Sequence, residues 1–368
     1  MLQQKSSVWR HFDLWLVAAV LLLTAYGVLM IESAVTGAPA FDDYPQRQLA
    51  YAVAGVAALF IIAAIDYRIL TSGHWYIYAG MLASLALVLI IGSLGNASRR
   101  WFDLGLIRIQ PSEFGRIFLA VTFGQFLAQR QHLVHRFSNT LLALAYVGVP
   151  VALIFVQPDL GMSILFIVMW FVMIFMAGLP LTHFAALTTG GLVAMVMLLP
   201  ALAEYQKERL LAFVDPGSVP EQAFNIEQAL ISIGTGGWFG KGYLQGTQSQ
   251  LGFLRVQHTD FIFSVITEEM GLIFGSLVVV GLMGFILLRI LKVAEMTPDP
   301  AGRYLCVGIA GVLFFQTVVS VGMNVRLLPV TGLTFPFVSY GGSSLITLFM
   351  AIGVVQSVRM RHRKQEFG

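Results

Sequence analysis

The segment FIFSVITEEMGLIFGSLVVVGLMGFILLRIL, residues 261–291, decides the fold of this chain. An apolar run of about 20 residues crosses the hydrocarbon core of a bilayer as a helix. This run is longer, so we expect a helix that tilts strongly or projects beyond the bilayer. Of the 368 residues, 57% are hydrophobic and 11% are charged, whereas a soluble domain has about 25% charged residues. The sequence therefore predicts an integral membrane protein.

Apolar runs predict an all-α, polytopic fold with about ten transmembrane helices. The runs cover residues 14–31, 49–65, 75–91, 114–127, 140–156, 162–176, 184–202, 261–291, 304–325 and 337–358. The first run is too long for a signal peptide and no small-residue cleavage site stands out, so we expect it to be the first span. We expect one membrane domain over residues 1–368, with a large extracytoplasmic loop at residues 205–258 between the seventh and eighth helices.

Loop charges predict that both termini are cytoplasmic. In that orientation the basic tail Arg359–Lys364 lies inside, together with the larger share of the Lys and Arg residues. The external side still keeps a group of cations, which are Arg99, Arg100, Lys207, Arg209, Lys241 and Arg255. A positive patch on an external loop is typical of an anion-binding surface, and we expect a substrate that carries phosphate.

Asp260 stands where the polar loop re-enters the apolar run. Acidic side chains at a membrane span are costly and usually functional. One interpretation is structural, with Thr259 or Asp260 capping the N-terminus of the helix. The other makes Asp260 a general base whose pKa is adjusted by partial burial and by nearby cations. Capping leaves Glu268 and Glu269 unexplained; both could pair with polar groups of adjacent helices, and we favour that role for Glu269.

A second polar cluster reads Arg99-Arg100-Trp101 and then Gln110-Pro111-Ser112-Glu113. The proline suits the first turn of a helix, and Glu113 complements the positive helix end. That helix does not require the two arginines, which can form charge-assisted hydrogen bonds to phosphate. Arg116 follows Glu113 by one turn and could pair with it or reach the same anion.

Four further segments have structural interpretations. Gln157-Pro158-Asp159-Leu160-Gly161 is typical of a turn, although Asp159 could also hold a cation or an arginine. Residues 223–233 have the spacing of an amphipathic helix that lies on the bilayer. The glycines at residues 234–242 allow a ligand to approach the backbone but lack the P-loop spacing. Small residues in the segment Gly332–Ser344, at the head of the last span, favour close helix contact, or their hydroxyls line a polar cavity.

Together these motifs resemble the SEDS family of polytopic membrane proteins. The segments that carry the resemblance are Arg99-Arg100-Trp101, residues 110–113 and 157–161, GWFGKGYLQGTQSQ at residues 237–250, His258–Phe263 and Pro336–Ser344. They occur in the family's order and extend over essentially the whole chain. The Gly-Thr-Gln run at residues 246–248 favours the cell-elongation branch of the family over its division branch.

The resemblance implies peptidoglycan glycosyltransferase activity that polymerises lipid II at the outer face of the bacterial cytoplasmic membrane. It implies a class B penicillin-binding protein and the elongation machinery as partners, with no nucleic acid. It makes Asp260 the catalytic residue. Substrate binding is expected at Arg99, Arg100, Glu113, Arg209, Lys241, His258 and Ser343, with support from Asp159, Arg116, Gln248 and Thr259.

The chain departs from the family pattern at Arg255-Val256, where Pro-Glu is usual. The change removes an acid that a metal site would use, so metal ligands stay unassigned. The sequence itself requires no cofactor, and Mg²⁺ or Mn²⁺ is the candidate cation. Arg116 stands where lysine is usual and keeps the charge with a different geometry. The single cysteine, Cys306, excludes a disulfide framework.

The resulting hypothesis is an inverting glycosyl transfer. Asp260 takes the proton from a sugar hydroxyl of the acceptor, and the external cations neutralise the departing lipid diphosphate. Two alternatives remain. A lipid II flippase would use the same acids and arginines, and a non-catalytic scaffold would only dock the penicillin-binding protein. Formation of polymer from lipid II in detergent separates the enzyme from the flippase.

Overall fold

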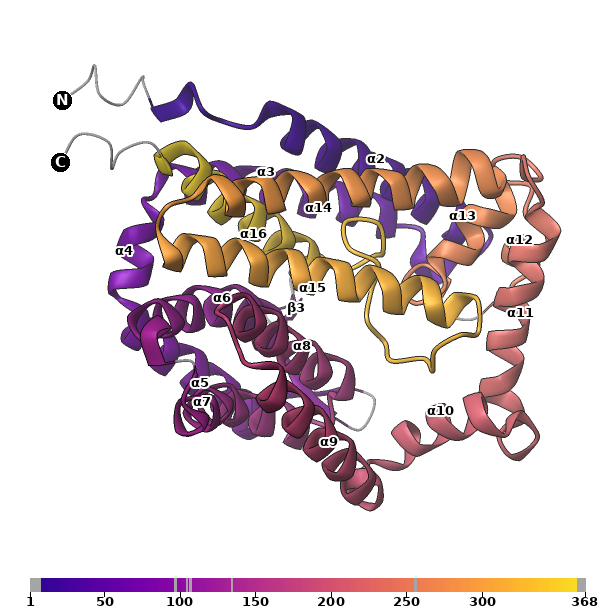
Figure 1. Ribbon diagram of the computed structural model, residues 1–368. Helices are drawn as coiled ribbons and strands as arrows, with labels where there is room; N and C mark the ends of the chain where they lie inside the picture. The colour runs from indigo at the N-terminus through magenta and orange to yellow at the C-terminus, as the bar shows by residue number, and fades with distance from the viewer. Residues whose placement is uncertain are drawn as a thin grey trace.

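Long helices lying side by side make up nearly all of the molecule (Figure 1). The structure is a computed structural model that describes residues 8–95, 98–103, 105, 108–133, 135–254 and 257–362. The long helices are α2 (Leu14–Val35), α3 (Tyr44–Ala64), α5 (His74–Ile91), α6 (Pro111–Gln129), α7 (Phe137–Val156), α8 (Leu160–Met176), α9 (Leu181–Leu198), α14 (Val278–Met296), α15 (Pro300–Asn324) and α16 (Gly342–Arg361). The all-α prediction is confirmed. The only strands in the described residues form a small antiparallel sheet of β1 (Ser93–Gly95), β2 (Ser98–Asp103) and β3 (Arg108–Ile109).

Eight helices in the described part of the chain are long and apolar enough to cross a membrane. Helix α8 is apolar but has 17 residues, and α6 carries Glu113 and Arg116 in its first turns. Both run beside the other long helices in Figure 1. The chain is therefore a multi-pass membrane protein, while the predicted number of crossings stays a prediction.

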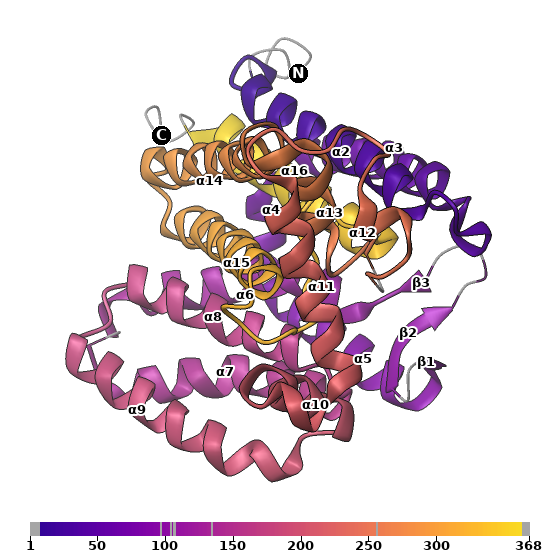
Figure 2. The ribbon, with the colours of Figure 1, turned by 90° about the vertical axis from the view of Figure 1, so that its right-hand side faces the viewer.

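The described chain starts and ends at the same end of the helix bundle (Figure 1). The opposite end carries α10 (Glu204–Val214), α11 (Pro220–Gly236) and α12 (Thr247–Gln250). Figure 2 looks onto that end and shows α10 and α11 in front of the long helices, with the small sheet to one side. That both ends lie on one side of the membrane stays a prediction, and so does the compartment that this side faces.

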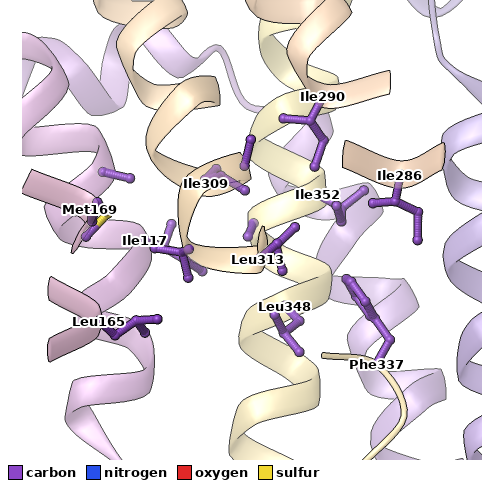
Figure 3. Close-up of a cluster of buried hydrophobic side chains, with 14 of the residues drawn as sticks. Ile117, Leu165, Met169, Ile286, Ile290, Ile309, Leu313, Phe337, Leu348 and Ile352 are labelled. Carbon is purple, nitrogen blue, oxygen red and sulfur yellow. The ribbon is translucent and has the colours of Figure 1, made fainter. Parts of the chain in front are cut away.

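The core is built around α15 and α16. In an apolar 18-residue stretch of each helix, 78% of the residues of α15 and 83% of those of α16 are buried inside the protein. Figure 3 shows buried side chains converging from several helices: Ile117 of α6, Leu165 and Met169 of α8, Ile286 and Ile290 of α14, Ile309 and Leu313 of α15, and Leu348 and Ile352 of α16. Helix α9 is the opposite case, because none of its residues is buried.

The apolar run that decides the fold is interrupted, so it is not one regular α-helix, while its strong tilt or its projection beyond the bilayer stays a prediction. Helix α13 (Ile262–Gly271) ends at a glycine with φ of 74°, a conformation that favours glycine. A π-helical turn at Leu272–Leu277 then leads into α14. The preceding loop takes up the amides at this break, since the Leu272 amide donates to the carbonyl of Gly237 at 2.9 Å. The break is tolerated because its backbone groups are hydrogen-bonded within the protein.

The amphipathic helix predicted at residues 223–233 is present as α11, which is longer. It crosses the ends of the long helices (Figure 1) and buries Ile226, Ala229 and Ser232. Its last residue, Gly236, lies directly against the backbone of Thr267 in α13. The buried face of α11 therefore packs on the protein, while its contact with a bilayer stays a prediction.

We predict that Gly236→Ala destabilises the protein. A Cβ at Gly236 would overlap the carbonyl oxygen of Thr267, and relieving such an overlap costs on the order of 1–3 kcal/mol. The melting temperature of the purified protein in detergent measures this cost. The control is Gly234→Ala in the same helix, because a Cβ there meets nothing within 4 Å. Equal melting temperatures for the two variants would contradict the packing of α11 on α13.

Candidate active site

Asp260 lies in a non-helical turn directly before α13. The helix begins at Ile262 and its N-cap position is Phe261, which makes no capping hydrogen bond. The capping position predicted for Thr259 or Asp260 is therefore corrected. The side chain of Asp260 is partly exposed. Burial raises the pKa of Asp260 above its ordinary value, and the positive charge of Arg209 opposes this rise.

Arg209 of α10 is a cation within electrostatic reach of two acids. Burial raises the pKa of Asp159 as it does that of Asp260, and Arg209 opposes the rise in both, alongside Arg100 at Asp159. The guanidinium carbon of Arg209 also lies 5.8 Å from the ring centre of Tyr205, within the range of a cation–π contact. Arg209 therefore connects the surroundings of Asp159 with those of Asp260.

Asp159 caps α8 and holds polar side chains at the same time. Its Oδ1 accepts from the amide of Met162 at 3.2 Å, and its Oδ2 accepts from Gln110 Nε2 at 2.8 Å. Arg100 Nη1 lies 4.0 Å from the same Oδ2. From the sequence we proposed that Asp159 belongs to a turn or holds an arginine. In the structure it caps α8 and lies near Arg100.

The two neighbouring arginines of β2 have different surroundings. Arg100 Nε donates to the carbonyl of Gln157 at 2.9 Å, and its Nη2 bonds the carbonyl of Pro158 and the hydroxyl of Tyr205. Arg99 is exposed and donates to the carbonyl of Ile90 at 3.0 Å. Successive side chains of a strand point to opposite faces. Of the two, Arg100 joins the cluster around Asp159 and Arg99 does not.

Glu113 and Arg116 lie inside the bundle. They form an ion pair in the first turns of α6 and are 8% and 5% exposed. Arg116 also donates to Gln316 of α15 and to Thr347 of α16, both at 2.9 Å. The pair therefore ties three helices together. A role of Glu113 in substrate binding stays a prediction.

Ser343, at the start of α16, accepts from the amide of Gln110 at 3.2 Å. The side chain of Gln110 donates in turn to Ser112 Oγ at 2.9 Å and to Asp159. Ser343 is 3% exposed. The structure thus places it in the hydrogen-bond network that positions the start of α6.

Glu268 and Glu269 of α13 hold the loop that precedes the helix. Glu268 accepts from the amide of Gln248 at 2.8 Å and pairs with Lys241 Nζ at 3.3 Å. Glu269 accepts from Ser33 Oγ of α2 at 2.6 Å. Both carboxylates have structural contacts, as favoured for Glu269. Lys241 and Gln248, expected near the substrate, are engaged by Glu268 instead of gathering around Asp260.

His258 packs among aromatic rings next to the Asp260 segment. The distances from its ring centre to those of Phe41, Tyr44 and Tyr340 are 5.2, 5.1 and 5.9 Å. Burial lowers the pKa of His258, so the neutral imidazole is favoured. These contacts account for its position without a substrate, and substrate binding by His258 stays a prediction.

A large cavity lies beside this polar cluster. Its volume is about 1900 Å³, and residues of α7, α8, α9, α14 and α15 line it. The lining is mainly apolar. Arg100, Asp159 and Arg209 contribute charged groups at one end, and Glu295 and Arg303 contribute them near the other. Asp260 is not part of this lining, and Arg209 is the lining residue that acts on its pKa.

Two buried polar residues near Asp260 were missed by the sequence analysis, Gln48 of α3 and Asn324 of α15. Ser339 is also buried, and it stands in the segment Pro336–Ser344 that the sequence analysis singled out. Asn324 stands within the apolar run 304–325, where an amide is costly unless it is hydrogen-bonded. That cost was the signal in the sequence that could have identified Asn324, whereas Gln48 stands just before the run 49–65.

The described part of the chain contains no evident set of metal ligands. Within it, no group of three or more His, Cys, Asp or Glu side chains is arranged to hold a metal ion. Arg255 and Val256 lie outside the described residues, so the structure does not address the effect predicted for that departure.

Comparison with known proteins gives matches along nearly the whole chain. The model of the FtsW/RodA/SpoVE cell cycle protein family matches residues 13–364. Stage V sporulation protein E of Bacillus subtilis is 37% identical over 355 residues, which cover 94% of this chain and 96% of that protein. Peptidoglycan glycosyltransferase MrdB of Escherichia coli is 35% identical over 357 residues, which cover 96% of this chain and 95% of that protein.

Solved structures show the same arrangement of helices. A chain from work on the structural coordination of polymerization and crosslinking by a peptidoglycan synthase complex aligns with a TM-score of 0.83 and 31% identity, over 96% of this chain and 99% of that one. The crystal structure of the rod shape determining protein RodA from Thermus thermophilus aligns with a TM-score of 0.73 and 30% identity, over 96% of this chain and 98% of that one.

We predict that Glu113→Gln lowers the free energy of unfolding by about 3–5 kcal/mol, because removal of one partner leaves the buried charge of Arg116 uncompensated. The melting temperature in detergent measures the loss. The double variant Glu113→Leu with Arg116→Met should recover much of it, because both charges are removed. Glu204→Gln, in an exposed pair with Lys207, is the control and should leave the melting temperature unchanged. A Glu113→Gln protein as stable as the parent would contradict the buried pair.

Proposed function

The chain belongs to the FtsW/RodA/SpoVE family, which is the SEDS family, and is a peptidoglycan glycosyltransferase; from this premise we propose that it polymerises lipid II, with Asp260 as the general base. One observation carries the proposal. Asp260, a partly exposed residue, stands within electrostatic reach of Arg209, which lines the charged end of a large apolar cavity. This arrangement offers a base, a cation for phosphate and space for a lipid in one place.

The reaction begins at a hydroxyl of the acceptor sugar. Its proton passes to the carboxylate of Asp260 while its oxygen attacks the anomeric carbon of the donor glycan. The bond from that carbon to the diphosphate oxygen breaks, and the lipid diphosphate leaves with the electron pair, so the configuration inverts. A positioned general base typically contributes about 10²–10⁴-fold to the rate. The raised pKa of Asp260 suits this role, because a base with a higher pKa takes up a proton more readily.

Charge on the departing diphosphate is neutralised by arginines. Arg209 and Arg100 line the charged end of the cavity, and guanidinium groups bind phosphate through paired hydrogen bonds. Fixed cations near a developing negative charge stabilise the transition state. A divalent cation, Mg²⁺ or Mn²⁺, would neutralise part of the same charge when bound with the substrate.

The apolar cavity suits the lipid chain of the substrate. Pockets for small ligands usually have volumes of about 300–1000 Å³, and this cavity has about 1900 Å³. Its lining is apolar along most of its length, so a hydrocarbon chain could occupy it without covering polar groups of the protein. The diphosphate would then lie at the end that carries Arg100 and Arg209, close to Asp260.

A flippase remains the second candidate because the cavity reaches towards both ends of the bundle. Glu295 lies in the last turn of α14 and Arg303 in the first turn of α15, and both line the cavity. A lipid-linked precursor could use such a path between the two leaflets. The enzyme is favoured because relatives of the chain, such as MrdB of Escherichia coli, are named peptidoglycan glycosyltransferases.

The relatives support a proposal for the partner and the membrane of this protein. One structural relative comes from a peptidoglycan synthase complex that coordinates polymerization and crosslinking. We therefore propose that this chain works with a class B penicillin-binding protein in cell elongation. The multi-pass protein would lie in the bacterial cytoplasmic membrane with both termini cytoplasmic, which puts the Asp260 end of the bundle outside.

We predict that Asp260→Asn abolishes polymerisation and keeps substrate binding. The amide has nearly the same shape but cannot accept the proton, so lipid II should bind with an affinity within about threefold of the parent while turnover falls by about 10²-fold or more. Polymer formed by purified protein in detergent and lipid II binding are the two measurements. Glu204→Gln on exposed α10 is the control. Normal polymer yield from Asp260→Asn would end the assignment of Asp260 as the base.

We predict an acid limb in the pH profile of kcat/KM that Arg209 controls. The base acts as a carboxylate, so activity is present above the pKa of Asp260 and is lost as pH falls through it. Burial places that pKa above the ordinary range, and Arg209 lowers it. Arg209→Gln should therefore move the limb to higher pH. Lys207→Gln in the same helix is the control, since Lys207 pairs with Glu204. A limb that stays in place in Arg209→Gln would contradict the coupling of Arg209 to the base.

A further inference from the structure

The three backbone carbonyls at His258, Thr259 and Asp260 are each taken by a donor from the other side of the site. The amide of Tyr340 donates to the carbonyl of His258 at 2.9 Å. Ser339 Oγ donates to the carbonyl of Thr259 at 2.7 Å. Asn324 Nδ2 donates to the carbonyl of Asp260 at 2.9 Å. Together these three donors fix the conformation of the turn, because each of the three carbonyls is held by a hydrogen bond.

Asn324 performs the capping that the sequence assigned to Asp260 or Thr259. Its Oδ1 accepts from both the amide and the hydroxyl of Ser264, at 3.1 and 2.6 Å. Ser264 belongs to the first turn of α13, whose amides have no partner inside the helix. Its Nδ2 donates to the carbonyls of Asp260 and Ser320. Asn324 therefore satisfies α13 from α15, and the carboxylate of Asp260 is not needed as a cap.

Gln48 supports the same arrangement from α3. Its Nε2 donates to the carbonyl of Ser339 at 3.1 Å, and its Oε1 accepts from the amide of Gly341 at 3.2 Å. The side chain is fully buried. A buried amide with both ends engaged holds a loop in one conformation, and this loop supplies the donors of Ser339 and Tyr340.

We propose that Asn324 and Ser339, supported by Gln48, are positioning residues that hold the carboxylate of Asp260 in its place relative to Arg209 for proton transfer. The inference rests on the proposed role of Asp260 as the base. None of the three side chains reaches the substrate in this account. They act by fixing the backbone from which the carboxylate projects, and a displacement of about 1 Å at a reacting group costs up to 10²-fold in rate.

Ser339→Ala tests the proposal with the loss of one oxygen atom. We expect kcat to fall by about 10–100-fold, with lipid II affinity unchanged within about threefold. Ser339→Thr keeps the hydroxyl and should restore most of the rate. Thr24→Val is the matched control, because the buried hydroxyl of Thr24 bonds only the carbonyl of Val20 in its own helix.

Gln48→Leu provides a second variant at a distance from the turn, with the same expected loss of kcat and retained affinity. Rates are expressed per folded molecule, with the folded fraction taken from size-exclusion and melting measurements. If both variants lower the melting temperature and leave kcat per folded molecule unchanged, the contacts are structural only and the proposal is overturned. Asp260→Asn is measured in parallel. Its inactivity with a normal Ser339→Ala overturns this inference alone, whereas an active Asp260→Asn overturns the proposed function itself.

Discussion

Non-helical backbone within a membrane protein is stable only where its carbonyl and amide groups find partners inside the protein. The centre of this molecule depends on that constraint. The turn before α13 and the loop after α15 are both irregular, and they satisfy each other through Ser339, Tyr340 and Asn324. Two segments far apart in the sequence become one unit. The side chain of Asp260 thus projects from an irregular backbone segment that would be unstable in a membrane without these partners.

At this end of the bundle, most acidic side chains have a specific partner in the protein. Asp159 caps α8, Glu113 neutralises Arg116, and Glu268 and Glu269 secure the external loop. Most of these carboxylates are fully engaged by the protein. Asp260 differs because capping falls to Asn324, a neutral amide from another helix. The carboxylate of Asp260, next to Arg209, is thus not the cap of α13.

The sequence predicted the class of fold well, because hydropathy over about 20 residues is a direct consequence of bilayer thickness. It also singled out Asp260, Arg209 and Asp159 as candidates, since charges are rare in such a chain, and their roles stay predictions. It missed the interruption at Gly271, which depends on a loop far from the run in sequence bonding the freed amides. It also grouped Lys241 with the substrate-binding cations, although its partner is Glu268. A list of charges does not reveal how those charges pair once the chain is folded.

Helix α9 contributes to the wall of the large cavity, yet none of its residues is buried. A wall that contributes so little to the core loses little contact free energy when it moves, so its opening is governed by a low local stability. The width of the cavity would then respond to the surrounding lipid, and bilayer composition becomes a determinant of how readily a lipid-borne molecule enters.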